Sequence, residues 1–286
     1  MSNPTLGQIT ASLRKTLSPI YGEGEAKAMI RLIFHNLKGW NQTQMIMNED
    51  TPLSDYILFK VNAILERLLK HEPIQYILGE AYFYGMNLKV DRSTLIPRPE
   101  TEELTDLIVN ANREDDLRVL DIGTGSGAIA IALSRNLPYS KVTAIDISAD
   151  ALNIATENAK NLHADIHFIE EDVFTYSPAP GSFDIIVSNP PYIDESEKAS
   201  MESNVLDYEP HGALFVPDSH PLIYYSRILE IASTALTANG RLYFEINPRH
   251  AAELKAMTEN EGFSDVNVIK DIHGKARFIT AIRNIK

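Results

Sequence analysis

The feature that most constrains the fold is the regular alternation of strand-like and helical segments in the last two-thirds of the chain. It predicts strands at 118–122, 141–147, 166–172, 183–189, 240–246, 265–270 and 277–283, and helices at 99–112, 128–136, 148–161, 221–238 and 249–260. Such alternation builds a parallel sheet with right-handed crossovers, so we expect an α/β, Rossmann-like fold. No helix separates the last two strands, and one of them should therefore run antiparallel.

The first 72 residues follow a different pattern. Apolar residues at helical spacing predict helices at 5–17, 23–37 and 53–69. Residues 73–96, rich in aromatic residues and glycine, predict a β-hairpin linker. We therefore expect a small all-helical domain at 1–72, a linker at 73–96 and an α/β domain at 97–286. The helical domain fits a scaffold and a protein-docking surface equally well.

Composition narrows the classes of protein to which the chain can belong. None of its apolar runs approaches the roughly 18 residues of a membrane span, and the start of the chain lacks the features of a signal peptide. The absence of cysteine excludes disulfides and thiolate chemistry and fits a cytoplasmic enzyme. The net charge is −13 without a dense basic cluster, which argues against a nucleic-acid substrate but does not exclude it. The eight histidines have no metal-ligand spacing.

A glycine-rich loop follows the first strand of the α/β domain and reads Gly123-Thr124-Gly125-Ser126-Gly127. This spacing differs from the Gly-x-Gly-x-x-Gly loop that cradles a pyrophosphate. The second strand ends in Asp146, where a carboxylate can accept hydrogen bonds from both hydroxyls of a ribose. S-adenosylmethionine carries a ribose without a phosphate; its carboxylate suits N–H groups at a helix start, and its ammonium suits an acid such as Asp121. The loop and the two acids predict a site for this cofactor.

The third predicted strand leads into Asp172 and Val173. An acid here can accept a hydrogen bond from the adenine amino group, and an apolar neighbour can pack on the ring. Each candidate also has an ordinary structural interpretation. Asp146 fits a cap for the helix that starts at Ser148, Asp172 fits a loop acid, and the glycines fit a tight turn. Three glycines at this point of a βαβ unit favour the cofactor site.

The segment FDIIVSNPPYI, residues 183–193, predicts a buried strand that is ended by Pro190 and Pro191. Asn189 is thereby placed on a rigid loop at the carboxyl edge of the sheet, where α/β folds bind ligands. The Asn189 side-chain oxygen and the Pro190 carbonyl can each accept one N–H of a planar amide or amino group, while Tyr192 covers a face. Asn189 is also expected to border the cofactor. An ordinary Asn-Pro turn is the alternative interpretation.

A methyl-sulfonium donor beside this loop predicts methyl transfer to a planar nitrogen. An amide nitrogen is a poor nucleophile because its lone pair is delocalised, so catalysis should be positional. Two acceptors that hold both N–H groups aim the nitrogen at the methyl group, and alignment at about 3–3.5 Å lowers the barrier by several kcal/mol. They also stabilise positive charge as it develops. Asn189 and Pro190 are the predicted catalytic residues. The reaction requires no metal and no covalent intermediate, and the proton leaves late, to water.

The chain resembles the bacterial release factor glutamine methyltransferases of the HemK/PrmC family. The similar segments are EPIQYILGEAYFYG (72–85), LIPRPETE (95–102), VLDIGTGSGAIAIAL (119–133), AIDIS (144–148), EDVF (171–174) and VSNPPYI (187–193). The resemblance implies an S-adenosylmethionine-dependent enzyme that methylates the glutamine of the Gly-Gly-Gln motif in class-1 peptide chain release factors, and S-adenosylhomocysteine as a product. It implies that Gly123 to Gly127, Asp146 and Val173 line the cofactor and that Asn189 to Tyr192 hold the glutamine. The helical domain and hairpin would dock the release factor, with no membrane or nucleic-acid partner.

Some positions depart from the family pattern. Val173 stands where an aromatic residue is frequent, and the fifth strand ends in Glu245-Ile246-Asn247 where Glu-x-Gly is usual. The roles of residues 245–249 and of residues 211–216 do not follow from the sequence. Arg98 fits either an anion contact or an ion pair with a nearby glutamate.

Two other functions fit part of this pattern. A nucleic-acid amino methyltransferase would hold a flipped base through the same Asn-Pro-Pro-Tyr loop. The acidic composition and the segments at 72–102 argue against it. A non-catalytic binding module would keep the fold, but the intact glycine loop, Asp146 and Asn189 to Tyr192 argue against loss of activity.

Overall fold

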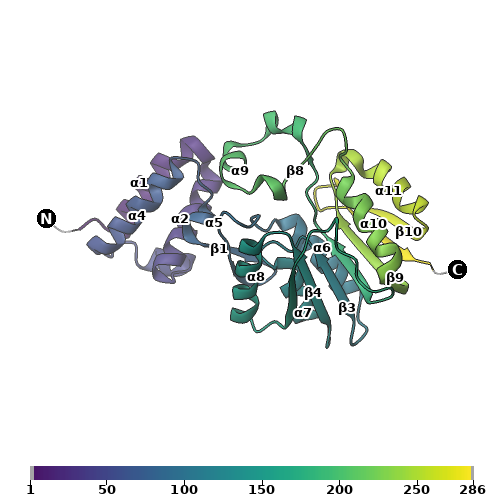
Figure 1. Ribbon diagram of the computed structural model, residues 1–286. Helices are drawn as coiled ribbons and strands as arrows, with labels where there is room; N and C mark the ends of the chain where they lie inside the picture. Colours follow the sequence, from purple (N-terminus) through teal and green to yellow (C-terminus); the bar gives the residue numbers. More distant parts are fainter. Residues whose placement is uncertain (1–2, 285–286) are drawn as a thin grey trace. The chain divides into compact units, whose positions relative to one another are not determined.

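The computed structural model describes residues 3–284, which form two compact units. The first unit contains the described residues up to Gly79 together with Ser203–Tyr208. The second contains Glu80–Glu202 and the described residues from Glu209 onward. Figure 1 gives the order of the elements along the chain. Within residues 3–284, no helix is both long and apolar enough to cross a membrane.

Up to Gly79, the described part of the helical unit contains the three predicted helices and two short ones that the pattern did not predict. These helices are α1 (Leu6–Tyr21), α2 (Glu23–Lys38), α3 (Gln42–Met47), α4 (Asp55–Leu68) and α5 (Ile74–Leu78). Helix α9 (Ser203–Tyr208) also belongs to this unit. The predicted start of α4 at residue 53 was wrong by two residues. Leu53 is buried, and the Ser54 side chain caps the helix by accepting a hydrogen bond from the Ile57 N–H. The core of the unit is mainly aliphatic; it includes Leu17, Ile33 and Leu68, together with the aromatic Phe34.

A β-hairpin begins the second unit. Strands β1 (Glu80–Phe83) and β2 (Met86–Lys89) pair antiparallel. A hairpin is thus present within the predicted range of 73–96, but it belongs to the second unit. Residues 74–78 form α5 instead, which ends at Gly79 in a left-handed conformation (φ 78°). Alternate hairpin side chains, including Phe83 and Leu88, are buried against helices of the α/β domain.

The second unit is organised around a seven-stranded sheet with the order β10-β11-β9-β6-β3-β4-β5. Its strands are β3 (Arg118–Ile122), β4 (Lys141–Asp146), β5 (Ile166–Glu170), β6 (Phe183–Ser188), β9 (Leu236–Glu245), β10 (Phe263–Lys270) and β11 (Ala276–Arg283). Five strands are parallel, and β11 runs antiparallel to both of its neighbours. The α/β prediction and the single antiparallel reversal are confirmed.

Strand β9 starts earlier than predicted. Leu236 is fully buried and pairs with Phe183 of β6, so the chain is already extended four residues before the predicted start at 240. The preceding helix ends at Ala235 for the same reason. Strands β5 and β6 end one or two residues before the predicted positions, which leaves Asp172 and Asn189 in loops.

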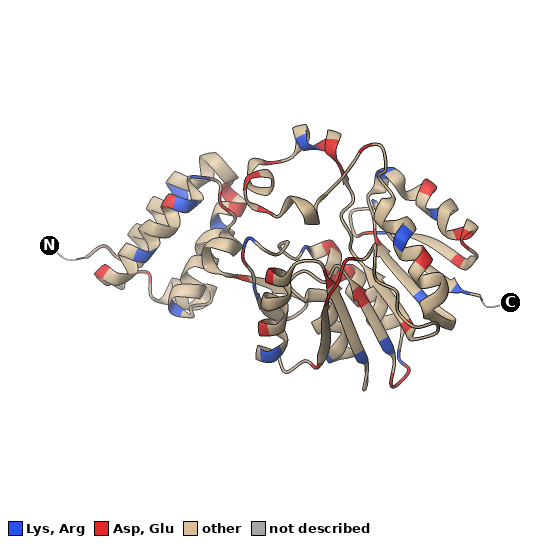
Figure 2. Ribbon diagram, viewed as in Figure 1, with Lys and Arg blue, Asp and Glu red and all other residues tan. Residues whose placement is uncertain are grey.

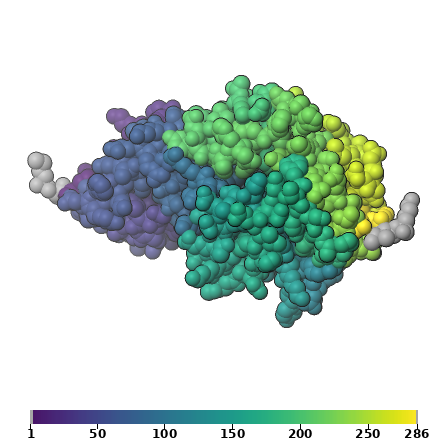
Figure 3. Space-filling view, viewed as in Figure 1, coloured from purple at the N-terminus to yellow at the C-terminus, as the bar shows by residue number. Residues whose placement is uncertain are grey.

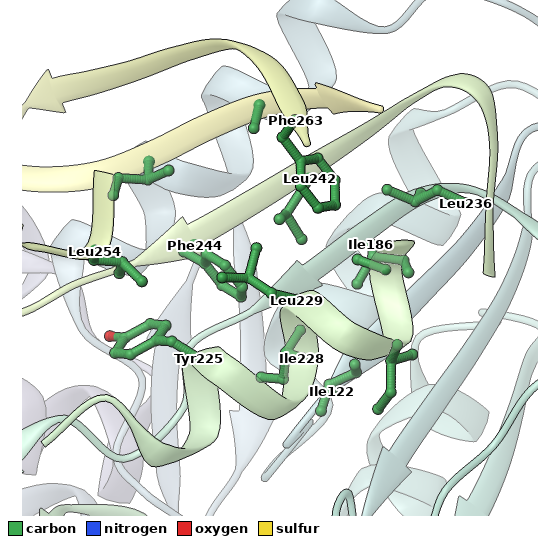
Figure 4. Packing of buried hydrophobic residues seen from close by; sticks show 14 of the residues in the cluster. Ile122, Ile186, Tyr225, Ile228, Leu229, Leu236, Leu242, Phe244, Leu254 and Phe263 are labelled. Atoms are coloured by element: carbon green, nitrogen blue, oxygen red, sulfur yellow. The ribbon is translucent and has the colours of Figure 1, made fainter. Parts of the chain in front are cut away.

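Helices cover both faces of the sheet. Helices α6 (Pro99–Ala111) and α7 (Ala128–Asn136) cover one face, and α8 (Ala149–Asn161) packs beside α7. Helices α10 (Ile223–Ala235) and α11 (Ala251–Asn260) lie side by side on the other face (Figure 1). The surface of this part of the chain is yellow-green to yellow in Figure 3. There Tyr225 and Leu229 of α10 pack against Leu242 and Phe244 of β9 (Figure 4). Burial on both faces explains the nearly continuous apolar sequence of the central strands.

The segment between β6 and α10, predicted as a long loop, contains several short elements. These are β7 (Ile193–Asp194), η1 (Glu195–Ser200), α9 (Ser203–Tyr208), η2 (His211–Ala213) and β8 (Phe215–Val216). Residues 211–216, which the sequence did not explain, include the strand that pairs with Ile193 just after the Asn-Pro-Pro-Tyr loop. The buried Glu209 accepts a hydrogen bond from the Ile96 N–H and pairs with Arg98. Arg98 therefore makes an ion pair with a glutamate, but the partner is buried and lies 111 positions away, whereas the predicted partner was a glutamate nearby in the sequence.

Candidate active site

The predicted site residues come together at the carboxyl edge of the central strands. Strand β3 lies between β4 and β6, so the strand order reverses there, which is the place where open α/β sheets bind ligands. The Ser188 hydroxyl at the end of β6 donates a 2.7 Å hydrogen bond to the Ile122 carbonyl at the end of β3. Acidic residues gather at this edge, in red near the strand ends in Figure 2.

The glycine loop turns tightly at the end of β3. The Gly123 and Thr124 N–H groups both donate to the Ile145 carbonyl, at 2.9 and 3.0 Å. Gly123 and Gly125 have positive φ angles of 75° and 55° and open space where a Cβ would stand. Gly127 differs, because a Cβ on it would lie 3.1 Å from the Cβ of Ala155 in α8. The first two glycines therefore leave room above the loop, whereas the third lets α7 and α8 pack closely.

Asp121 is fully buried beneath this loop. The Thr124 hydroxyl donates a 2.7 Å hydrogen bond to Asp121 Oδ2, whereas Oδ1 is buried without a hydrogen-bond partner in the described part of the chain. Burial, with the Asp146 charge as a smaller contribution, raises the pKa of Asp121 to about 7, although the Thr124 hydroxyl and the Ala130 backbone N–H lower it. An unsatisfied carboxylate oxygen at a ligand-binding edge fits a cationic partner.

Asp146 ends β4 and contacts two backbone segments. Its Oδ2 accepts a 2.8 Å hydrogen bond from the Gly125 N–H, and its Oδ1 accepts one of 2.9 Å from the Ser148 N–H. The Ser148 side chain also caps α8, as the sequence predicted. Burial raises the pKa of Asp146, and the two N–H donors lower it. Each carboxylate oxygen has a second lone pair, so Asp146 can still accept hydrogen bonds from a ligand.

Asp172 and Val173 lie in the turn after β5. Asp172 Oδ1 accepts a 2.9 Å hydrogen bond from the Phe174 N–H, which leaves its other carboxylate oxygen for further contacts. Val173 is partly buried against the core, and its carbonyl accepts a 3.0 Å hydrogen bond from Arg227 Nε. The turn is therefore held in place on the α10 side of the sheet.

Asn189 is oriented by helix α6. Its Nδ2 donates a 3.2 Å hydrogen bond to the Thr101 hydroxyl, which leaves the side-chain oxygen Oδ1 available as an acceptor. The Thr101 hydroxyl in turn donates a 2.7 Å hydrogen bond to Glu245 Oε2 at the end of β9. Pro190, which follows Asn189, is buried. The structure thus joins the Asn-Pro-Pro-Tyr loop to Thr101, a residue of the segment at 95–102.

Tyr192 is held by the same glutamate. Its hydroxyl donates a 3.0 Å hydrogen bond to Glu245 Oε1, and its ring packs against the core on the α10 side of the sheet. Burial raises the pKa of the Glu245 carboxyl, while hydrogen bonds from Thr101 and Tyr192 and the nearby Arg277 charge lower it. Burial and the Glu245 charge raise the pKa of Tyr192 well above its ordinary value.

The segment after Glu245 holds the outer part of the loop. Asn247 Nδ2 donates to the Tyr192 carbonyl at 3.1 Å and to Glu197 Oε1 at 2.8 Å. The buried Asp194 accepts hydrogen bonds from Arg249 Nη1 and makes 3.0 Å contacts with His250 Nε2. Asn247, a departure from the usual family glycine, therefore has a structural role in this chain.

Sequence reasoning missed several residues of this site. Thr101 and Glu245 lie within or beside the motifs, but the sequence pattern assigns no role to either. The signal for Glu245 was a lone acid at the end of an apolar strand, a place where burial makes a charge costly unless it has partners. Ile147, which directly follows Asp146, is 68% exposed although it is a large apolar residue. Its side chain is therefore available for contact with a ligand at this edge.

Comparisons with known proteins agree with this geometry. Residues 101–207 match the family model of the methyltransferase small domain, and residues 8–79 match that of the PrmC N-terminal domain. A solved methyltransferase structure from Pyrococcus furiosus superposes with a TM-score of 0.53, covering 77% of this chain and 98% of that one at 19% identity. At this identity the superposition supports the fold alone.

Curated relatives are much closer in sequence. A release factor glutamine methyltransferase of Bacteroides thetaiotaomicron is 50% identical over 279 residues, which cover 97% of this chain and 100% of the relative. A protein of the same name from Flavobacterium psychrophilum is 43% identical over 93% of this chain and 94% of its own length. The resemblance inferred from the sequence is thereby confirmed: the chain belongs to the release factor glutamine methyltransferase family.

Proposed function

We propose that this enzyme transfers a methyl group from S-adenosylmethionine to the side-chain amide nitrogen of a glutamine in a release factor. The observation that carries the proposal is the orientation of Asn189, whose Nδ2 is engaged by Thr101 so that Oδ1 remains as an acceptor. A glutamine side-chain amide has two N–H groups and requires two such acceptors. The names of the curated relatives support the substrate class.

The residues at the carboxyl edge fit the proposed cofactor. The unsatisfied Oδ1 of Asp121 suits the ammonium group, and the backbone N–H groups near the start of α7 suit the carboxylate. Asp146 suits the ribose, and Asp172 suits the adenine amino group. The open space above Gly123 and Gly125 admits the part of the cofactor that joins its amino-acid end to the ribose. Val173 and Ile147 are the apolar residues available to the adenine ring. When bound, the cofactor supplies an electrophilic methyl group.

The protein's own contribution is to position the substrate nitrogen. In the proposed arrangement, Asn189 Oδ1 and the Pro190 carbonyl each accept one N–H of the glutamine amide, and the Tyr192 ring covers one face of it. Because both N–H groups are held, the nitrogen is aimed at the methyl group and cannot rotate away. The two oxygens also stabilise the positive charge that develops on nitrogen, and the proton then leaves to water.

Substrate identity within this proposal follows from the family. We place the target in the Gly-Gly-Gln motif of class-1 release factors, and we assign docking of the release factor to the helical unit and the β-hairpin. The relatives do not favour the alternative of a base amine in nucleic acid, because they carry the release factor name.

The decisive experiment is methyl transfer from labelled S-adenosylmethionine to a purified, unmethylated release factor. A release factor with the Gly-Gly-Gln glutamine replaced, total RNA and total DNA serve as parallel substrates. The proposal expects label on the wild-type factor alone, mapped to that glutamine by mass spectrometry. Label on nucleic acid without label on the factor would refute it and assign the loop to a base amine.

A further inference from the structure

The backbone of Glu245, which carries the buried carboxylate, is held in position by its neighbours. The Glu245 carbonyl accepts a 2.8 Å hydrogen bond from the Tyr225 hydroxyl of α10. The Tyr225 ring packs against Phe244 (Figure 4). The two rings meet edge-on, with centroids 5.1 Å apart. Phe244 in turn pairs with Ser188 at the end of β6. The end of β9 is therefore held beside the strand that delivers Asn189.

The two carboxylate oxygens of Glu245 contact two different elements. Oε2 accepts a hydrogen bond from Thr101 of α6, and Oε1 accepts one from Tyr192 of the loop after β6. Thr101 extends the connection by one step, since its hydroxyl also contacts Asn189 Nδ2. One side chain thus supports both the amide that holds the substrate and the aromatic ring next to it.

The chemistry of these groups gives the chain of hydrogen bonds a direction. Burial opposes ionisation of Glu245, but the Thr101 and Tyr192 hydrogen bonds and the Arg277 charge favour its ionised form. An ionised carboxylate only accepts, so in that form the single proton of the Thr101 hydroxyl must point to Glu245. The Thr101 oxygen can then only accept from Asn189, which requires the Asn189 NH₂ group to face it. If the Asn189 amide were flipped, its oxygen would meet the Thr101 oxygen without a proton between them. The same flip would present NH₂ to the substrate amide, which is itself a donor.

We propose that Glu245 is a positioning residue which, through Thr101, fixes the direction of the Asn189 amide and, through Tyr192, anchors the substrate-holding loop. This inference rests on the proposed function, because it assigns Asn189 Oδ1 to the substrate. Glu245 touches neither reacting atom. Its role is to keep an acceptor, rather than a donor, turned toward the glutamine amide.

The direction of the hydrogen bonds from Asn189 through Thr101 to Glu245 can be tested with substitutions that keep the size or shape of the side chain. Glu245→Gln keeps the size of the side chain but offers an NH₂ group, so Thr101 no longer has to donate to it. Thr101→Val keeps the shape of threonine and removes the hydroxyl, whereas Thr101→Ser keeps the hydroxyl. Thr258→Val is a matched control, because Thr258 is a fully buried helical threonine whose hydroxyl bonds to a backbone carbonyl in α11.

The readouts are kcat and KM with purified release factor, the Kd of S-adenosylmethionine by calorimetry, and the melting temperature. We expect kcat of Glu245→Gln and Thr101→Val to fall by about 10²-fold, the usual effect of misplacing a reacting group, with the cofactor Kd unchanged. Thr101→Ser should regain at least tenfold of the kcat lost in Thr101→Val. Thr258→Val should have the kcat of the wild type. If Glu245→Gln fails to fold, the Thr101 pair decides by itself.

Different outcomes separate this inference from the proposed function. A wild-type enzyme that leaves the release factor unlabelled would overturn both. A wild type that labels the factor, together with Glu245→Gln of equal kcat, would overturn the positioning role alone. Equal losses in Thr101→Ser and Thr101→Val would also overturn it, because the hydroxyl would then be irrelevant.

Discussion

Tyr192 and Glu245 are joined by a 3.0 Å hydrogen bond in which the tyrosine hydroxyl donates to a carboxylate that is only 1% exposed. The bond fastens the loop after β6 to the end of β9. The hydroxyl therefore anchors the loop, and in the proposed arrangement the ring, which is partly buried against the core, covers the substrate with its exposed part. Substitutions at this position can separate the two.

Tyr192→Phe should lower stability more than it affects catalysis. It leaves Glu245 Oε1 buried without its donor, which costs about 1–3 kcal/mol in the free energy of unfolding. Tyr192→Ala removes the ring as well, and we expect it to raise KM for the release factor more than the Kd for S-adenosylmethionine. Denaturant titrations and steady-state kinetics of both variants measure these effects. An unchanged KM in Tyr192→Ala would contradict the covering role of the ring.

Asn189→Ala should abolish most of the methyl transfer while cofactor binding persists. Removal of one of two charge-stabilising groups typically lowers kcat by about 10²–10³-fold. Cofactor affinity, measured by calorimetry, should stay close to that of the wild type. Asn110→Ala, at an exposed asparagine of α6, is the matched control. Equal losses of affinity and turnover in Asn189→Ala would argue that Asn189 serves mainly the cofactor.

Cofactor binding should depend on pH through Asp121. Its pKa is raised from 3.8 to about 7, mainly by burial, so near neutral pH part of the free protein carries a protonated Asp121. The cofactor ammonium favours the ionised form, and binding should therefore release a proton. Affinity should rise with pH up to about 7 and then level off. Calorimetry in buffers of different ionisation enthalpy counts the protons released.

The same shift affects the stability of the free protein. Because the folded-state pKa lies above the unfolded-state value, protonation of Asp121 stabilises the fold at acidic pH, and this contribution is lost as pH rises through about 7. Asp121→Asn should remove both the pH dependence of stability that comes from Asp121 and the pH dependence of cofactor binding. Retention of the pH dependence in Asp121→Asn would assign it to another group.

Gly125→Ala should mainly weaken cofactor binding, whereas Gly127→Ala should mainly lower stability. Both place a side chain at positive φ, which costs about 1–2 kcal/mol. Gly127→Ala also forces a Cβ to within 3.1 Å of Ala155 and Ile131, and such overpacking adds about 1–3 kcal/mol. Gly127→Ala should therefore have the lower melting temperature. Gly125→Ala should lose more cofactor affinity, relative to its loss of stability, than Gly127→Ala does. The reverse order of melting temperatures would refute this division of roles.

The sequence by itself determined most of the longer helices and strands, and it predicted part of the candidate site. Strand and helix periods are local, and so are the effects of Pro190 and of the glycines on the backbone. The sequence therefore predicts a sheet within residues 118–283, and it places Asp121, Asp146 and Asn189 at one edge of that sheet. Family motifs added the chemistry. Elements of two to six residues, such as α3, α9 and β8, were missed because a period needs more residues to be recognised.

Only the tertiary structure decided how the site is supported. Thr101 and Glu245 lie 144 positions apart, and Tyr192 and Glu245 lie 53 apart, so no local pattern relates them. Their contacts depend on the strand order that places β9 beside β6 and on the packing of α6 against the sheet. Burial of Asp121 has the same origin, and burial is what raises its pKa. Periodicity specifies which face of an element is apolar, but only packing in three dimensions specifies which polar groups meet behind that face.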